Sequence, residues 1–137
     1  MQKFKNIYML CPPQTESGGP EASHQLVGEM CKLDISANLI YYKKRKTIFN
    51  LKGKLGISVK GNVILTTKYL NPTPKSYDCY SASISNKIID DENNLLILPE
   101  NVLHLVNFGK RIKKAIWWLS IDNALMAISK LQNISVL

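Results

Sequence analysis

The pair Gly18-Gly19 is the first place in the sequence where the residue types could do chemistry. These glycines end a proline-containing loop and stand directly before a predicted helix. Glycines let a ligand approach the backbone, and the free N–H groups of a helix start favour an anion or a polar sugar oxygen. Tight packing of the turn is the alternative reason for the pair. The loop matches neither GxGxxG nor a P-loop, so dinucleotide and Walker-type sites are not predicted.

Two carboxylates follow directly after predicted strands. Glu100 comes after an apolar run that ends at Pro99, and Asp122 and Asn123 come after a second run, Ala115–Ser120. Parallel sheets place their ligands at the carboxyl ends of their strands. We therefore expect both carboxylates at a ligand-binding edge.

The elements that must position these residues alternate between strand and helix. Lys5–Cys11 and Ala37–Tyr42 are nearly continuous apolar runs, typical of strands covered on both faces. Between them, an apolar stripe at helical spacing predicts a helix that faces the sheet through Ala22, Leu26, Met30 and Leu33. Strand, helix and strand in this order predict a right-handed crossover onto a parallel sheet.

The second half of the chain repeats this alternation. A buried strand is predicted at 95–98, a short helix at 102–108, a further strand at 115–120 and the start of another helix at 124. The sequence therefore predicts an α/β fold, a Rossmann-like three-layer domain with a mainly parallel sheet.

Length and composition restrict the class of protein. The chain has 137 residues, enough for one ordinary domain, and its 45% of apolar residues can fill a core. Three cysteines without a CxxC pair predict neither a disulfide framework nor a zinc cluster, and they favour a reducing cytoplasm. No apolar run is long enough to span a membrane, and the first residues lead into a strand. We therefore expect no secreted, fibrous or membrane-spanning protein.

The net charge of +8 comes from one segment, residues 43–75, which holds nine basic residues and no acid. Glycines and prolines interrupt it, and the short apolar runs 57–59 and 63–67 could form a hairpin. We predict an irregular basic insertion on the surface. Solvated lysines are one explanation, and attraction to an anionic membrane surface or protein partner is the other. Nucleic acid is a weaker candidate, because the segment carries no nucleic-acid recognition motif.

Three motifs, in order, resemble one family of enzymes. KNIYMLCPPQTESGGPEASHQLVGEMCKL resembles the first strand, the SGGPE-type loop and the HQL-bearing helix of bacterial GT-B-class glycosyltransferases. LLILPE resembles the end of their vvvPE strand, and KKAIWWLSIDN resembles their WWLSvDN strand and loop. These enzymes are of the capsule or lipopolysaccharide type and are related to the large family-4 group. The resemblance covers residues 3–42 and 77–128 and fails over the basic segment.

The resemblance implies that residues 1–137 form the N-terminal domain of a two-domain enzyme. In such enzymes a glycan or lipid-linked acceptor binds mainly to the N-terminal domain, and the nucleotide-sugar donor binds mainly to the C-terminal domain. Transfer occurs between the domains without an essential metal, and we expect no cofactor. Because a donor domain needs about 150 further residues, we expect a missing C-terminal domain or a split-enzyme subunit as partner. Alone, the chain should be inactive; its expected location is the cytoplasm or the inner face of the membrane.

The same resemblance suggests roles for individual residues. Asp122 or Glu100 is expected to be catalytic, as the base that takes the proton of the acceptor hydroxyl, and Glu100 could instead bind acceptor hydroxyls. The alternatives are a helix N-cap at Asp122 and a solvated carboxylate at Glu100. Substrate binding is expected from Gly18, Gly19, His24, Trp118 and Asn123.

Two of these binding residues have a structural alternative. His24 lies near the glycine loop, but a partly exposed helical histidine without chemistry would give the same sequence. Trp117 and Trp118 point to opposite faces of their strand, so Trp118 could stack on a sugar ring while Trp117 fills the core. The alternative is that both tryptophans lie in the core.

Two other classes of function stay open at this point. One is a non-catalytic α/β module that binds an anionic membrane surface or a protein partner through residues 43–75. The other is a nucleotide- or phosphate-binding enzyme with a flavodoxin-like sheet. Tight nucleotide binding by this chain would indicate the latter.

Overall fold

The computed structural model describes residues 3–42, 58–60, 63–65, 71–107 and 109–120, together with Asp122 and Leu125. Most of the predicted basic insertion and the predicted binding residue Asn123 lie outside the described residues. No helix in the described part is long and apolar enough to cross a lipid bilayer.

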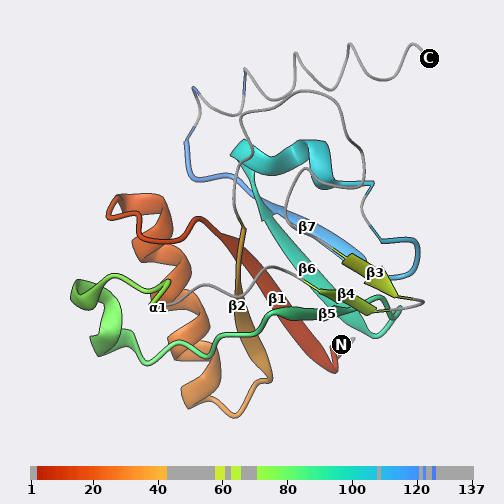
Figure 1. Ribbon diagram of the computed structural model, residues 1–137, viewed down its shortest axis with the longest axis horizontal. Helices are drawn as coiled ribbons and strands as arrows, with labels where there is room; N and C mark the ends of the chain where they lie inside the picture. Colours follow the sequence, from red (N-terminus) through yellow and green to blue (C-terminus); the bar gives the residue numbers. More distant parts are fainter. Residues whose placement is uncertain are drawn as a thin grey trace.

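Four parallel strands form the main sheet of the protein, in the order β2-β1-β6-β7 (Figure 1). They are β1 (Asn6–Cys11), β2 (Ala37–Tyr41), β6 (Asn94–Pro99) and β7 (Lys113–Trp117). Helix α1 (Gly18–Lys32) connects β1 to the parallel neighbour β2. The predicted α/β, Rossmann-like fold with a mainly parallel sheet is confirmed.

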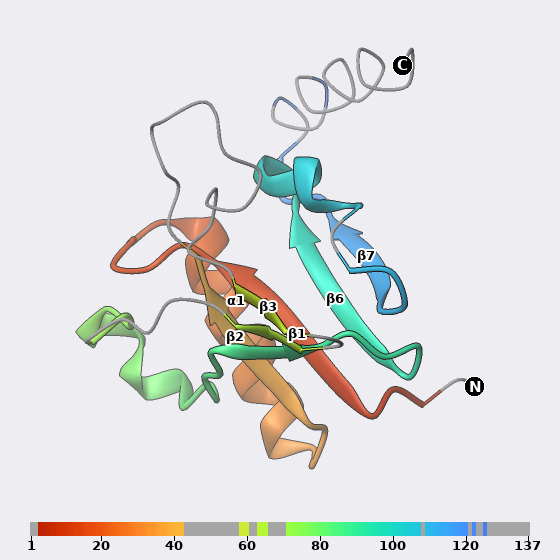
Figure 2. The same cartoon turned by 45° about the vertical axis from the view of Figure 1, so that its right-hand side comes forward.

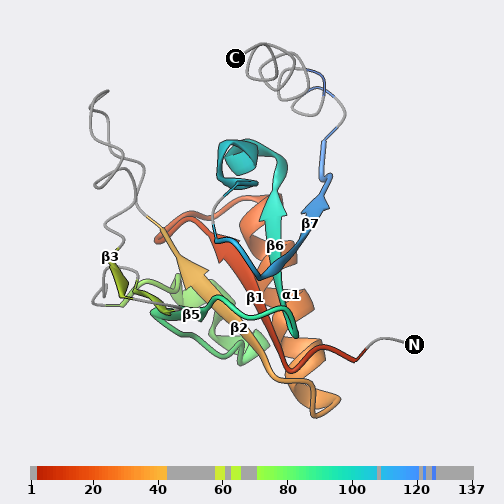
Figure 3. The same ribbon diagram turned by 90° about the vertical axis from the view of Figure 1, so that its right-hand side faces the viewer.

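A small antiparallel sheet lies against one face of the main sheet (Figure 3). It consists of β3 (Ser58–Lys60), β4 (Val63–Leu65) and β5 (Lys87–Ile89). The hairpin expected within the basic segment is therefore present as β3 and β4. Strand β5 was not predicted, because it is only three residues long and pairs with a distant strand.

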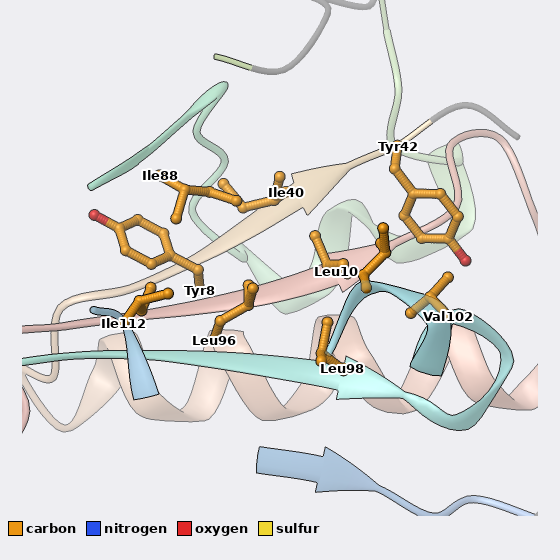
Figure 4. Packing of buried hydrophobic residues seen from close by; sticks show 10 residues of the cluster. Tyr8, Leu10, Ile40, Tyr42, Ile88, Leu96, Leu98, Val102 and Ile112 are labelled. Atoms are coloured by element: carbon orange, nitrogen blue, oxygen red, sulfur yellow. The ribbon is translucent and has the colours of Figure 1, made fainter. Parts of the chain in front are cut away.

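Each face of the parallel sheet has its own cluster of buried side chains, because side chains alternate along a strand. Ile7, Met9 and Cys11 of β1 face α1, where they meet Val27. Tyr8 and Leu10 face the other side, shown in Figure 4. That side is covered by Ile88 of β5 and by the short 3-10 helix η2 (Glu100–Leu105). The predicted helix at 102–108 thus begins two residues earlier than expected and is a 3-10 helix.

The buried face of α1 differs from the predicted stripe. The structure buries Ser23, His24, Val27 and Gly28, whereas Leu33 is 72% exposed. Leu26 and Met30 pack at the margin of the core. The reason is close packing: a methyl group on Gly28 would lie 2.2 Å from the carbonyl oxygen of Tyr80, at the end of the 3-10 helix η1 (Lys75–Tyr80). Small residues let α1 approach η1, so the helix turns this side inward.

Candidate functional site

The order of the strands creates a crevice between β1 and β6. The chain passes from β1 to β2 on one side of β1, while β6 and β7 lie on its other side. Loops that follow β1 and β6 therefore leave the sheet in opposite directions, and open α/β sheets bind ligands at this point. In Figure 2 the carboxyl ends of β1 and β6 point to the edge where α1 begins and η2 lies.

A pocket of about 490 Å³ lies at this carboxyl edge. The segments that follow all four parallel strands contribute to it. Its polar described residues are Thr15, Ser17, Ser23, Tyr42, Glu100, Asn101 and Ser120. Gly19, Leu119 and three prolines complete the described part of the wall. Two residues predicted from the sequence, Gly19 and Glu100, therefore line this pocket.

Glu100 is a buried carboxylate on the pocket wall. It is 6% exposed, and its Oε2 accepts a hydrogen bond of 3.2 Å from the backbone N–H of Leu119. This is its one hydrogen bond within the described part of the chain, and neither ion pair found there includes it. A carboxylate has about four acceptor sites, so most of its capacity is free for a ligand. The alternative of a solvated carboxylate is wrong.

Tyr42 follows β2 and brings a second buried polar group to the pocket. The residue is 2% exposed, and its hydroxyl has no hydrogen-bond partner. Burial raises the pKa of this phenol to about 12. The side chain of Asn101 acts to lower this pKa, but the two groups do not meet at hydrogen-bond distance and angle. Figure 4 shows the hydroxyl pointing beyond the carboxyl ends of the strands.

The two predicted glycines form the start of α1, with Ser17 as N-cap residue. Gly19 lines the pocket, and a methyl group on it would make only an ordinary contact, 3.5 Å from Leu119 Cδ1. A methyl group on Gly18 would meet nothing within 4 Å. Neither glycine has a left-handed backbone. Tight packing therefore does not require glycine at either position, and of the two only Gly19 is among the described residues that line the pocket.

The glycine loop is held in place by the segment that precedes β5. The backbone N–H of Gln14 donates to Pro72 O at 2.9 Å, and the Tyr77 hydroxyl donates to Ser17 O at 3.3 Å. One helical turn further, the Tyr80 hydroxyl donates to Glu21 at 2.6 Å. These contacts fix the loop and the first turn of α1, and with them one wall of the pocket.

His24 lies behind the pocket wall. It is 1% exposed, which corrects the alternative of a partly exposed histidine. Its Nδ1 lies 2.6 Å from Pro20 O and its Nε2 lies 2.7 Å from the Tyr41 hydroxyl. Since a carbonyl can only accept, Nδ1 carries the proton, and in the neutral ring Nε2 accepts from Tyr41. His24 therefore positions the first turn of α1 and is not among the residues that line the pocket.

The residues that follow β7 stand at the same edge as the pocket. Leu119 and Ser120 line it, whereas Trp118 is 44% exposed and lies beside them in the chain. Trp118 is thus not part of the core, and Trp117 packs at the margin of the α1-side cluster. Asp122 is exposed, two residues past the pocket residue Ser120. The structure brings Gly19 and Glu100 together on the pocket wall, whereas Trp118 and Asp122 are not among its described lining residues.

The described wall of the pocket carries one negative charge and no positive one. None of its described residues is lysine, arginine or histidine. Within the described residues, no group of three or more histidine, cysteine, aspartate or glutamate side chains could hold a metal ion. The arrangement can accept hydrogen bonds from hydroxyl or ammonium groups through Glu100, and donate one through Tyr42.

Tyr42 was missed by sequence reasoning, although a signal for it existed. It is the last residue of a predicted strand, so the rule that indicated Glu100 applies to it as well.

Comparisons of this chain with protein-family models, with curated proteins and with solved structures found no match.

Proposed function

We propose that the protein is the acceptor-side domain of a glycosyltransferase and that the pocket between β1 and β6 binds the sugar acceptor. Three motifs that resemble this class converge on the pocket: the glycine loop supplies Gly19, the residue directly after β6 is Glu100, and the segment after β7 supplies Leu119. Ligands of open α/β sheets bind at this position.

The observation that carries the proposal is the buried carboxylate of Glu100 with unused acceptor capacity. A buried charge is costly unless it is paired or hydrogen-bonded. An acceptor hydroxyl that donates to Glu100 would supply the missing hydrogen bond. The same contact would hold the hydroxyl for attack on the donor sugar, and the carboxylate could take its proton.

The charge of the pocket favours an acceptor over a nucleotide donor. A diphosphate placed beside Glu100 would meet a like charge without a cation among the described residues of the wall. Sites for phosphate commonly add Arg or Lys to the free N–H groups of a helix start, and the described wall supplies neither of these side chains. Donor binding therefore falls to the proposed C-terminal domain or partner subunit, and the chain alone would bind acceptors without transferring sugar.

Saturation-transfer NMR on the chain tests this function, with glucose, galactose and mannose as probes. We expect binding of at least one sugar, and Glu100→Gln should weaken it by about ten-fold or more, since hydrogen bonds to charged groups contribute about 1.5–3 kcal/mol. Glu29→Gln makes the same chemical change at an exposed site on α1 and should leave binding unchanged. Absence of sugar binding, or equal loss in both variants, would contradict the proposal.

A further inference from the structure

The hydroxyl of Tyr42 is the one fully buried side-chain polar atom without a hydrogen-bond partner in the described part of the chain. A buried hydroxyl without a partner destabilises the folded protein, because its hydrogen bonds to water are lost and not replaced. The ring needs no hydroxyl to pack, since it lies in a cluster with Leu10, Leu98 and Val102. Because Tyr42 lies on the pocket wall, contact with a ligand is a reason for tyrosine in place of phenylalanine at this position.

Tyr42 is able to donate a hydrogen bond over the whole physiological range of pH. Its pKa is raised to about 12, first of all by burial. The hydroxyl therefore stays protonated and offers one donor and two acceptor sites. Such a hydroxyl can donate a hydrogen bond to a ligand hydroxyl or accept one from it.

The electrostatics of the pocket complement this neutral group. Glu100 brings a negative charge, and no described wall residue brings a positive one. The start of α1 has a partial positive charge of about one half, but Glu21 in its first turn opposes it. Among the described residues of the wall, the net charge is therefore negative, which disfavours an anion beside Glu100 and favours a neutral or cationic group.

We propose that Tyr42 and Glu100 together select the charge class of the acceptor, an inference that rests on the sugar-binding function proposed above. The pocket takes a neutral hexose or an amino sugar, whose hydroxyl and ammonium groups donate to Glu100 and pair with Tyr42. It rejects uronic acids and phosphorylated sugars, whose anionic groups meet the Glu100 carboxylate.

A matched series of sugars tests the charge selection on the full chain. The first series, with the ring configuration of glucose, is glucose, glucosamine and glucuronate. The second, with the ring configuration of galactose, is galactose, galactosamine and galacturonate. At about pH 6.5, where the amino group is protonated, we expect the neutral and amino sugars of at least one series to bind about ten-fold more tightly than the uronate. A uronate that binds as tightly as its neutral counterpart would overturn the selection and leave the sugar-binding function intact. Failure of every sugar to bind would overturn both.

The role of Tyr42 has a separate test with a matched control. Tyr42→Phe should lower the affinity for the neutral sugar by about three- to ten-fold, the usual effect of one neutral hydrogen bond. It should not lower the melting temperature, because the hydroxyl has no partner in the protein.

Tyr8→Phe is the control, because Tyr8 belongs to the same cluster and points to the other end of the strands (Figure 4). Its hydroxyl accepts a hydrogen bond from the Ile89 N–H at 3.4 Å. This variant should lower the melting temperature and leave the affinity unchanged. Equal affinities of Tyr42→Phe and the unaltered protein would overturn the role of Tyr42, and so would a melting temperature lowered as much as in Tyr8→Phe.

Discussion

Asp90 and Glu100 are the two buried carboxylates in the described part of the chain, and they use their oxygens differently. Asp90 accepts three backbone N–H groups, from Lys110, Arg111 and Ile112, at 2.8–2.9 Å. Glu100 accepts one. The first arrangement fixes the turn before β7, whereas the second leaves acceptor sites for a ligand. Counting hydrogen bonds thus separates a structural carboxylate from a candidate functional one.

Asp90→Asn should lower the free energy of unfolding by about 1–3 kcal/mol at neutral pH, because the amide cannot accept all three N–H groups. Urea denaturation measures this loss. Asp34→Asn should be neutral: Asp34 is exposed and has a left-handed backbone that asparagine also adopts.

The loss of unfolding free energy in Asp90→Asn should depend on pH. Burial acts to raise the pKa of Asp90, and the N–H groups of Ile112, Lys110 and Arg111 together outweigh it, so the pKa lies below its usual value. A lowered pKa in the folded state stabilises the protein above about pH 4 and ceases to do so as the pH falls through the folded pKa. The difference between the two proteins should therefore be constant near neutrality and shrink in acid. A difference that grows in acid would contradict this account.

For single residues, the sequence predicts the place in the fold better than it predicts which other residues the side chain contacts. Glu100 and Gly19 could be predicted because each follows a recognisable strand or loop. The burial of His24 between Pro20 and Tyr41, and the missing partner of Tyr42, depend on residues brought together by the fold. No local pattern encodes such pairings.

Helix α1 owes its orientation to a close approach at Gly28. Gly28→Ala would place a methyl group 2.2 Å from the Tyr80 carbonyl oxygen, so the helix and η1 must separate. We expect a loss of about 1–3 kcal/mol from this overpacking, although alanine gains up to about 1 kcal/mol of helix propensity.

Gly18→Ala is the matched control, since a methyl group there meets nothing within 4 Å. Thermal and urea denaturation of both variants give the comparison. If Gly28→Ala were as stable as Gly18→Ala, the close contact between α1 and η1 would be disproved.

Elements differ in how well the sequence predicts them. Strands β1, β2 and β6 are predictable because burial on both faces makes them continuous apolar runs. Strand β7 has no buried residue and spans Lys113–Trp117, so the predicted strand at 115–120 is placed two to three residues too late. The buried face of α1 was misplaced, because Ser23 and Gly28 do not belong to an apolar stripe and face inward for reasons of space. Strand β5 cannot be predicted from the sequence, because it is short and pairs with β4 only in the folded chain.

At the scale of the whole molecule, parallel pairing decides where chemistry is possible. Because β1, β6 and β7 all run in the same direction, the segments that carry Gly19, Glu100 and Leu119 meet at one edge. That convergence was predictable from the alternation of strand and helix. The order β2-β1-β6-β7, and with it the crevice between β1 and β6, was not, since strand order depends on long-range pairing.

The proposed binding of a sugar in this crevice can be followed in amide NMR spectra of the chain during titration with the neutral sugar of highest affinity. We expect the largest shifts on Gly19, Glu100 and Leu119 and on their neighbours around the pocket. Shifts concentrated at the amino ends of the strands, around Asn6 and Asn94, would contradict the proposed binding, as would spectra that do not change.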